Sequence, residues 1–238
     1  MQKLSVALLC SAMASGVAVA QESGTKWKKE AELGYVATSG NTETQTLSAK
    51  AKAEAELTKW RHKAGIEMLQ SEDDNSTIAE KYNVYGQTNY KFAETQYAWG
   101  TLGYEDDRFS GFKYQVTAAA GYGIRVINKE AMTLDFEAGP GVRIIELDAA
   151  NSDSDSEGVF RIAGNFQWDV SETAHFSQEL TSEIGEDITI SKSVTALQSQ
   201  VNGSLAMKLT YTLKNTSDVP VGIKETDTET AVTLVYSF

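Results

Sequence analysis

The residues with the clearest capacity for chemistry are His175 and Ser177, which lie two apart in the segment His-Phe-Ser. Residues two apart on a strand share a face, so a histidine base could approach a serine nucleophile, as in an outer-membrane lipid hydrolase. Such an enzyme also needs a group that orients the imidazole and a site for the oxyanion. The alternating pattern of the chain predicts a membrane-spanning β-barrel, as argued below. In that barrel both side chains point into the interior, near the periplasmic end of their strand and away from outer-leaflet lipid. We therefore predict that the chain is not an enzyme, with this hydrolase as the less favoured alternative.

Acidic residues gather in three segments, 148–157 (DAANSDSDSE), 72–74 (EDD) and 105–107 (EDD). Their oxygens are the ligand type that Ca²⁺ prefers. The spacing matches no calcium-binding loop, and no glycine stands at a diagnostic turn position. We predict solvated loops outside the membrane, which could hold divalent ions loosely beside lipopolysaccharide, and neither a metal site nor a cofactor.

Charged residues alternate with apolar ones along much of the chain. In residues 47–57, Leu and Ala occupy every second position, and lysines and glutamates stand between them. A helix would spread these alanines over all its faces, whereas a strand gathers them on one, and the neighbouring segments also favour a strand. One register along the chain gives these candidate lumen-facing residues: Lys50, Lys52, Glu54, Glu56, Arg61, Glu67, Asp135, Glu137, Arg143 and Arg161. It also turns inward Lys63, Arg125, Asp169, Glu179, Glu183, Lys192 and Lys208.

The elements that must position these residues are strands. Alternating segments predict twelve strands, near residues 28–37, 44–57, 60–70, 79–91, 96–105, 113–126, 131–144, 159–170, 174–184, 189–201, 204–214 and 228–238. Each is about as long as a tilted strand that crosses a bilayer, roughly 9–11 residues or slightly more. Short connections between the strands alternate with connections that are mostly longer. In outer-membrane barrels the turns on the periplasmic side are short, so we place the short connections and both termini on that side. The sequence therefore predicts an all-β fold, a transmembrane up-and-down antiparallel β-barrel. Pro140 lies inside one of these strands, where a bulge or a local bend is expected.

The last strand has one large apolar face, made by Thr230, Val232, Leu234, Tyr236 and Phe238. We predict that this face meets lipid and that the strand pairs with the strand at 28–37, which removes both sheet edges. Tyr236 and Phe238 resemble the terminal signal that the outer-membrane barrel assembly machinery recognises. Four tryptophans fall near periplasmic strand ends, which predicts an interfacial aromatic belt: Trp27, Trp60, Trp99 and Trp168.

The first residues predict export. Lys3, the apolar run 4–9 and the Ala-Val-Ala of residues 18–20 have the order of a cleavable signal peptide. We expect residues 1–20 to be this signal peptide, 21–26 a short lead and 27–238 the barrel. The single cysteine then leaves with the signal, so disulfides do not stabilise the mature chain. A net charge of −12 argues against a nucleic-acid partner.

Several phrases resemble a known family, the salt-induced outer-membrane proteins of Gram-negative bacteria, which are built on a domain of unknown function. They are residues 39–42 (SGNT), 105–112 (EDDRFSGF), 137–143 (EAGPGVR) and 217–220 (SDVP). The resemblance covers nearly the whole mature chain and implies an outer-membrane barrel, with no substrate, cofactor or catalytic residues.

Two functions suit a charged barrel interior. About eight strands fill their own interior and about sixteen leave a channel, so twelve lie between. The charges could line a narrow pore for small polar solutes or ions, used in salt or envelope adaptation. Alternatively, ion pairs brace and block the interior of a non-conducting structural or interaction barrel. The pattern favours the pore, in contact with outer-membrane lipid and lipopolysaccharide, and leaves the oligomeric state open.

Overall fold

The computed structural model describes residues 26–39, 45–73, 76–107, 112–147, 154–220 and 222–238. The predicted signal peptide and nearly all of the lead lie outside these residues, as do positions 148–153 of the acidic segment. The described residues form twelve strands: β1 (Lys26–Ser39), β2 (Gln45–Glu56), β3 (Trp60–Asp73), β4 (Ser76–Lys91), β5 (Gln96–Asp107), β6 (Phe112–Lys129), β7 (Met132–Leu147), β8 (Ser154–Asp169), β9 (Ala174–Gly185), β10 (Thr189–Gln200), β11 (Leu205–Thr216) and β12 (Thr226–Ser237).

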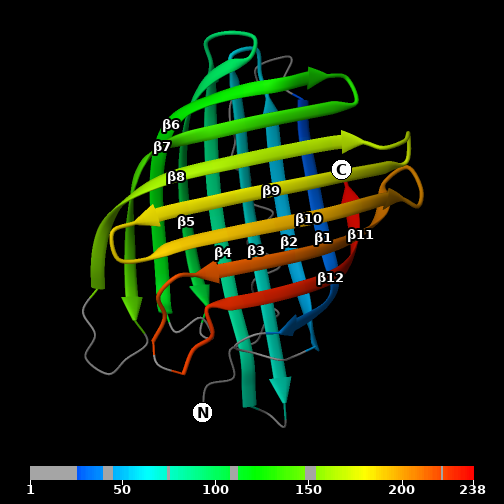
Figure 1. Cartoon of the computed structure of the whole chain (residues 1–238). Coiled ribbons are helices and arrows are strands. Elements are labelled where there is room, and N and C mark those ends of the chain that lie inside the picture. Colours follow the sequence, from blue (N-terminus) through cyan, green and yellow to red (C-terminus); the bar gives the residue numbers. More distant parts are fainter. Residues whose placement is uncertain (1–25, 40–44, 74–75, 108–111, 148–153, 221) are drawn as a thin grey trace, which may run out of the picture.

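Each strand pairs with its neighbours along the chain, and β12 pairs with β1, so the sheet is a closed antiparallel barrel. This confirms the predicted fold class. In Figure 1, β1 to β5 run steeply down the view while β9 to β12 run across it, as two walls of tilted strands do. The C-terminal rim is the end of the barrel at which β12 ends, and the opposite rim is the other end. Among the residues that the structure describes, no helix is long and apolar enough to cross a membrane.

The closing strands β1 and β12 pair as predicted. Ala31 of β1 lies opposite Tyr236 of β12, and Leu33 lies opposite Leu234. The Phe238 amide donates a hydrogen bond of 3.0 Å to the carbonyl of Lys29, which extends the pairing to the last residue. Closure therefore leaves neither terminal strand with an open edge.

Apolar residues cover the outer wall. Leu33, Leu102, Phe136, Phe160 and Leu234 each have about half or more of their side-chain surface exposed. Their neighbours in sequence point into the barrel, and many of these are charged. This alternation is the reverse of a soluble protein and fits a barrel wall that faces lipid.

The tryptophans correct one expectation. Trp27, Trp60 and Trp168 are 44%, 42% and 40% exposed and lie on the outer wall near the C-terminal rim. Trp99 is only 3% exposed, shares the inner face with Tyr97, and donates a hydrogen bond to the Tyr122 carbonyl. Only three of the four tryptophans therefore lie on the outer face. Trp99 stands an odd number of positions from Ala98 and Leu102, which point outward, so its own side chain points into the barrel.

Pro140 of β7 causes no bulge, because Ala119–Gly141 and Tyr122–Ala138 keep the same register on either side of it. The β6 and β7 backbones instead come very close beside it. A Cβ at Gly139 would lie 2.1 Å from the Ala120 carbonyl oxygen, so only glycine fits. Close contact, together with the curvature of both strands (Figure 1), accommodates the proline.

Candidate functional site

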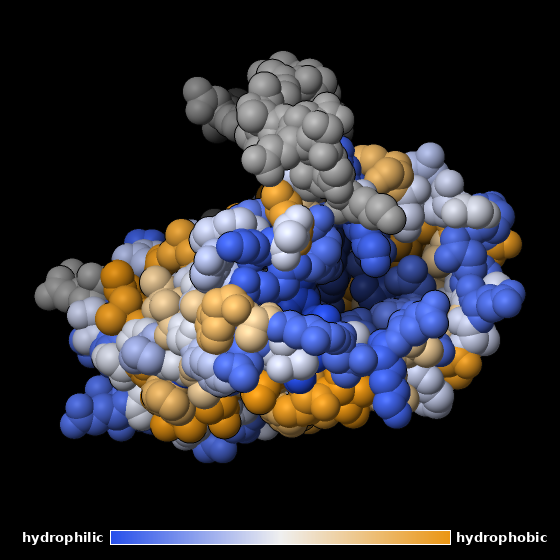
Figure 2. All heavy atoms as spheres, turned by 90° about the horizontal axis from the view of Figure 1, so that it is seen from above, coloured by the Kyte–Doolittle hydropathy of each residue, from blue (hydrophilic) through white to orange (hydrophobic). Residues whose placement is uncertain are grey.

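The candidate site is the lumen, the space inside the barrel. Figure 2 shows hydrophilic residues gathered around a hollow, while hydrophobic residues spread over the outer wall. Ion pairs join strands that are not neighbours in the sheet. Such pairs can form only across the inside of a closed barrel, so they identify the lumen-facing residues.

One ion pair near the opposite rim joins opposite walls. Lys214 Nζ of β11 lies 2.5 Å from Glu105 Oε1 of β5, and these strands are six positions apart in the twelve-stranded sheet. Extended lysine and glutamate side chains together reach roughly 12 Å by their bond lengths. A circular barrel of twelve strands would be about 25 Å across. The lumen is therefore narrowed at this level, with one charge from each wall.

Glu105 and Asp107 correct the prediction that residues 105–107 form an extracellular loop. Strand β5 continues through Asp107, whose carboxylate lies 3.6 Å from Lys81 Nζ of β4. Both acidic side chains have the inward parity of Thr101 and Gly103. Strand β5 extends two residues beyond the predicted 96–105, and this extension brings Asp107 into the lumen beside Glu105.

Further ion pairs lie at the height of Glu105 and Lys214 and closer to the middle of the barrel. Lys50 of β2 lies 3.7 Å from Glu67 of β3 and 3.7 Å from Glu229 of β12. Nearer the middle of the barrel, Glu32 accepts a hydrogen bond of 2.9 Å from Lys208, and Lys52 stands 3.7 Å away. Two ammonium groups thus stabilise one buried carboxylate, because an unpaired charge there would be costly.

An arginine–carboxylate cluster occupies the half nearer the C-terminal rim. Arg125 of β6 binds both oxygens of Asp135 with nitrogen–oxygen distances of 2.6 and 2.8 Å. Arg61 of β3 approaches the same carboxylate at 3.5 Å, and its guanidinium lies over the Tyr97 ring. The bidentate geometry fixes Asp135 firmly. This cluster joins β3 to β7 and narrows one side of the lumen.

Glu137 of β7 is the centre of a second group beside the first. It accepts hydrogen bonds from Gln87 at 2.8 Å and from the Tyr97 hydroxyl at 3.0 Å. Arg161 of β8 lies 3.3 Å from its other oxygen and stacks over the Trp99 ring. The buried aromatic rings thus support the charged groups from behind. This part of the wall is tightly packed, and its charged groups are paired.

Arg143 of β7 is fully buried and serves a different purpose. Its guanidinium lies 2.6 Å from Glu157 of β8 and 3.6 Å from Glu183 of β9. It also donates a hydrogen bond to the Ile188 carbonyl, in the turn between β9 and β10. One side chain therefore ties three strands and a turn together near the opposite rim.

The structure counts against the hydrolase arrangement. His175 Nδ1 lies 2.7 Å from Asp169 Oδ1, and Nε2 lies 2.7 Å from Gln167 Oε1. Both ring nitrogens are thus occupied, and neither is left to take a proton from Ser177. His62 lies on the outer wall instead, stacked on Trp60 and hydrogen-bonded to Thr88.

Metal ligands do not converge in the described part of the chain, where no three His, Cys, Asp or Glu side chains could hold an ion together. Of the acidic segment 148–157, only its last residues are described. There Asp155 caps the amide of Ser156 at 2.7 Å.

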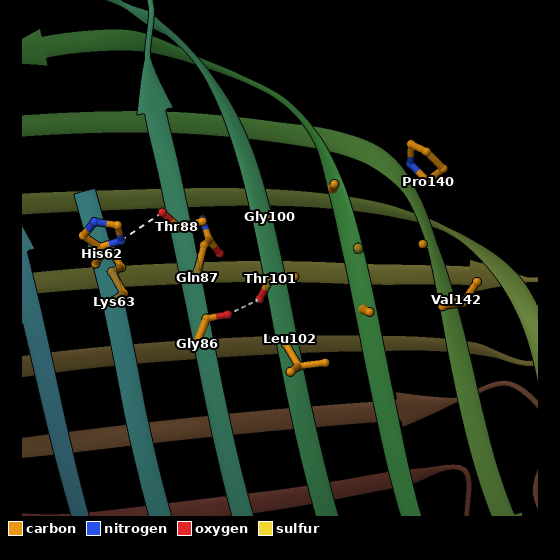
Figure 3. Close-up of a pocket in the computed structure, with 14 residues that line it drawn as sticks. His62, Lys63, Gly86, Gln87, Thr88, Gly100, Thr101, Leu102, Pro140 and Val142 are labelled. Atoms are coloured by element: carbon orange, nitrogen blue, oxygen red, sulfur yellow. Dashed lines mark hydrogen bonds between the residues drawn. The ribbon is translucent and has the colours of Figure 1, made fainter. Parts of the chain in front are cut away.

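A depression of about 800 Å³ lies on the outer wall over β3 to β7. Small residues make its floor: Gly86, Gly100, Ala118, Ala120 and Pro140. In Figure 3 the imidazole of His62 and the hydroxyl of Thr88 meet at its edge, and Leu102 and Val142 border it.

All ten residues predicted to face the lumen occupy inward positions of their strands. Nine of them, all except Glu54, form an ion pair. Glu56 pairs with Arg61 and Lys91. The pattern missed eight charged residues of this network: Glu32, Lys81, Lys91, Glu105, Asp107, Glu157, Lys214 and Glu229. Parity could have found them, since Lys214 stands six residues after the inward Lys208. Nothing in the alternating pattern indicates that Glu105 and Lys214 would meet.

Comparison with known proteins decides the family. A family model described as "Protein of unknown function, DUF481" matches residues 31–238. The chain belongs to this family. It is 28% identical over 207 residues to "Uncharacterized protein YdiY" of Escherichia coli (strain K12), covering 86% of this chain and 80% of that protein.

Two solved structures resemble this DUF481 chain in fold. The NanC porin matches with a TM-score of 0.60 and 9% identity, over 87% of this chain and 100% of that one. The translocator domain of the autotransporter NalP from Neisseria meningitidis matches with a TM-score of 0.51 and 12% identity, over 88% of each. At these identities the likeness shows the fold alone, a closed membrane-type barrel.

Proposed function

We propose that this DUF481 protein is an outer-membrane barrel that forms a narrow, water-filled pore for small polar solutes or ions. It reaches the cell outer membrane through a cleaved signal peptide, contacts lipid and lipopolysaccharide there, and serves in the adaptation of the envelope to salt. No catalysis is part of this proposal, since both ring nitrogens of His175 are occupied.

The main observation in favour of a pore is that the lumen contains open space. Gly103 of β5 has inward parity, and a Cβ built on it would meet no atom within 4 Å. A barrel interior filled with side chains would leave no such gap. The walls around the gap are charged or hydroxylated, which suits hydrated solutes.

The competing function is a non-conducting structural barrel. The pairs Glu105–Lys214 and Arg61–Asp135 support it, because both cross part of the lumen. Lysine and glutamate side chains are flexible, however, and a pair made by two rotatable chains narrows a pore without sealing it. Conductance separates the two functions.

Single-channel recording of refolded protein in planar bilayers tests the pore, with Gly103→Phe as the diagnostic variant. The added ring enters the open space of the lumen, and we expect single-channel conductance to fall about twofold or more. The matched control is Gly158→Phe, because Gly158 also has nothing within 4 Å but has the outward parity of Phe160. Silent bilayers for the wild type, or equal conductance for both variants, would overturn the pore.

A further inference from the structure

Glu105 and Lys214 present one negative and one positive group across the narrowed lumen. Their side chains are only 17% and 12% exposed, so both charges are largely removed from bulk water. They come from opposite walls, so any solute that passes this level must move between them or replace their contact. Nothing else in the described lumen joins strands so far apart.

Other charged side chains surround this ion pair, and they differ between the wall that carries Lys214 and the wall that carries Glu105. Lys192 of β10 lies directly opposite Lys214 in the register of β10 and β11, so two ammonium groups share one wall. On the other wall Asp107 stands two residues from Glu105, with Lys81 3.6 Å from its carboxylate. One wall of the constriction therefore favours a carboxylate, and the other offers acceptors to an ammonium group.

The gap at Gly103 lies next to this pair, two residues along β5 toward the C-terminal rim. A small solute held between Glu105 and Lys214 would have free space directly behind it. The pair and the gap together form a place where a solute of a few heavy atoms could rest.

Resting on the pore proposed above, we propose that Glu105 and Lys214 determine its specificity and favour small zwitterionic solutes, which carry one ammonium and one carboxylate group. A zwitterion that separates the pair binds Lys214 and Lys192 with its carboxylate and Glu105 with its ammonium group. Every buried charge keeps a partner of opposite sign throughout this exchange.

Other solutes lack this compensation. An anion that binds Lys214 removes the cation that Glu105 contacts directly, and a cation that binds Glu105 removes the carboxylate that Lys214 contacts. Breaking a largely buried pair in this way is costly, since the abandoned charge stays desolvated. A neutral solute replaces neither charge. Passage therefore depends on charge pattern as well as on size.

The test measures solute efflux from vesicles that contain the refolded full barrel. The probes are glycine and three molecules of similar size: neutral glycolamide, anionic glycolate and cationic ethanolammonium. For the wild type we expect glycine to leave faster than all three. In the double variant Glu105→Gln/Lys214→Met, which removes both charges together, the glycine-to-glycolamide ratio should fall about tenfold.

The control is Lys113→Met/Glu146→Gln, which removes an ion pair of 2.5 Å that includes the exposed Lys113, and this variant should keep the wild-type ratio. Efflux no faster than from protein-free vesicles would overturn the pore itself. Efflux that follows size alone in the wild type, or a ratio unchanged in the double variant, would overturn only the specificity. If the double variant does not fold, the order of the four probes in the wild type decides.

Discussion

At the scale of single residues, Arg143 should matter most for stability. It is fully buried, pairs with two carboxylates, and donates hydrogen bonds to two backbone carbonyls, those of Glu183 and Ile188. Replacing Arg143 by Met leaves Glu157 and Glu183 without their cation, although their side chains are only 13% and 15% exposed. We expect a loss of about 3–5 kcal/mol in the free energy of unfolding, the range for one broken buried ion pair.

Urea unfolding in lipid vesicles measures this loss. Lys113→Met is the control, because the Lys113 side chain is 60% exposed and an ion pair in contact with solvent contributes little to stability. Equal stability of the two variants would show that Arg143 does not hold β8, β9 and the following turn together.

Single residues also show where sequence reasoning stops. Parity in an alternating strand assigns a side chain to a face, and it did so for Lys50, Glu67 and Arg161. For Trp99, nearness to a rim predicts the wrong face and parity the right one, because an aromatic ring suits both the membrane interface and a packed lumen wall. The contact between Glu105 and Lys214 could not be predicted, because it depends on how closely the two opposite walls approach each other across the lumen.

At the scale of elements, β12 combines closure and assembly. Its outward residues continue to Phe238, whose ring stacks on Tyr236 and lies 5.9 Å from Lys29 Nζ. Deleting Phe238 removes this stack and the last hydrogen bond to β1, so the closing edge frays. We expect the yield of folded barrel in membranes to fall severalfold, while any conductance of the folded fraction stays unchanged.

Gel mobility of unheated membrane samples measures the folded fraction. Phe92→Ala is the matched control, since Phe92 is also a half-exposed aromatic residue at the C-terminal rim but lies in a turn. A normal folded yield without Phe238 would contradict its role as a signal for the barrel assembly machinery.

The twelve strands themselves were predictable, because apolar and polar residues that alternate over ten or more positions are typical of a strand with two unlike faces. Their ends were not. Strand β6 begins at Phe112 and ends at Lys129, beyond the predicted 113–126, and register shifts near both of its ends accommodate the extra length. Such irregular pairing depends on the partner strand, which a local pattern does not contain.

At the scale of the whole molecule, the outer wall fixes how the barrel must sit in a bilayer. Trp27, Trp60 and Trp168 lie outward near one rim, while Trp99 lies inward at a similar height. Lipids that carry bromine on their acyl chains quench a tryptophan only on contact. If the barrel spans the bilayer, we therefore expect strong quenching of Trp27, Trp60 and Trp168 and weak quenching of Trp99.

Four variants that each keep one tryptophan, with phenylalanine at the other three positions, allow this measurement in vesicles of brominated lipid. We expect the Trp60 variant to lose most of its fluorescence when bromines lie near the headgroups and less when they lie near the bilayer centre, because an interfacial belt sits at headgroup level. The Trp99 variant should respond weakly to either lipid. Quenching of Trp99 as strong as that of Trp60 would mean that Trp99 also contacts lipid, which would contradict its place on the inner face of the barrel.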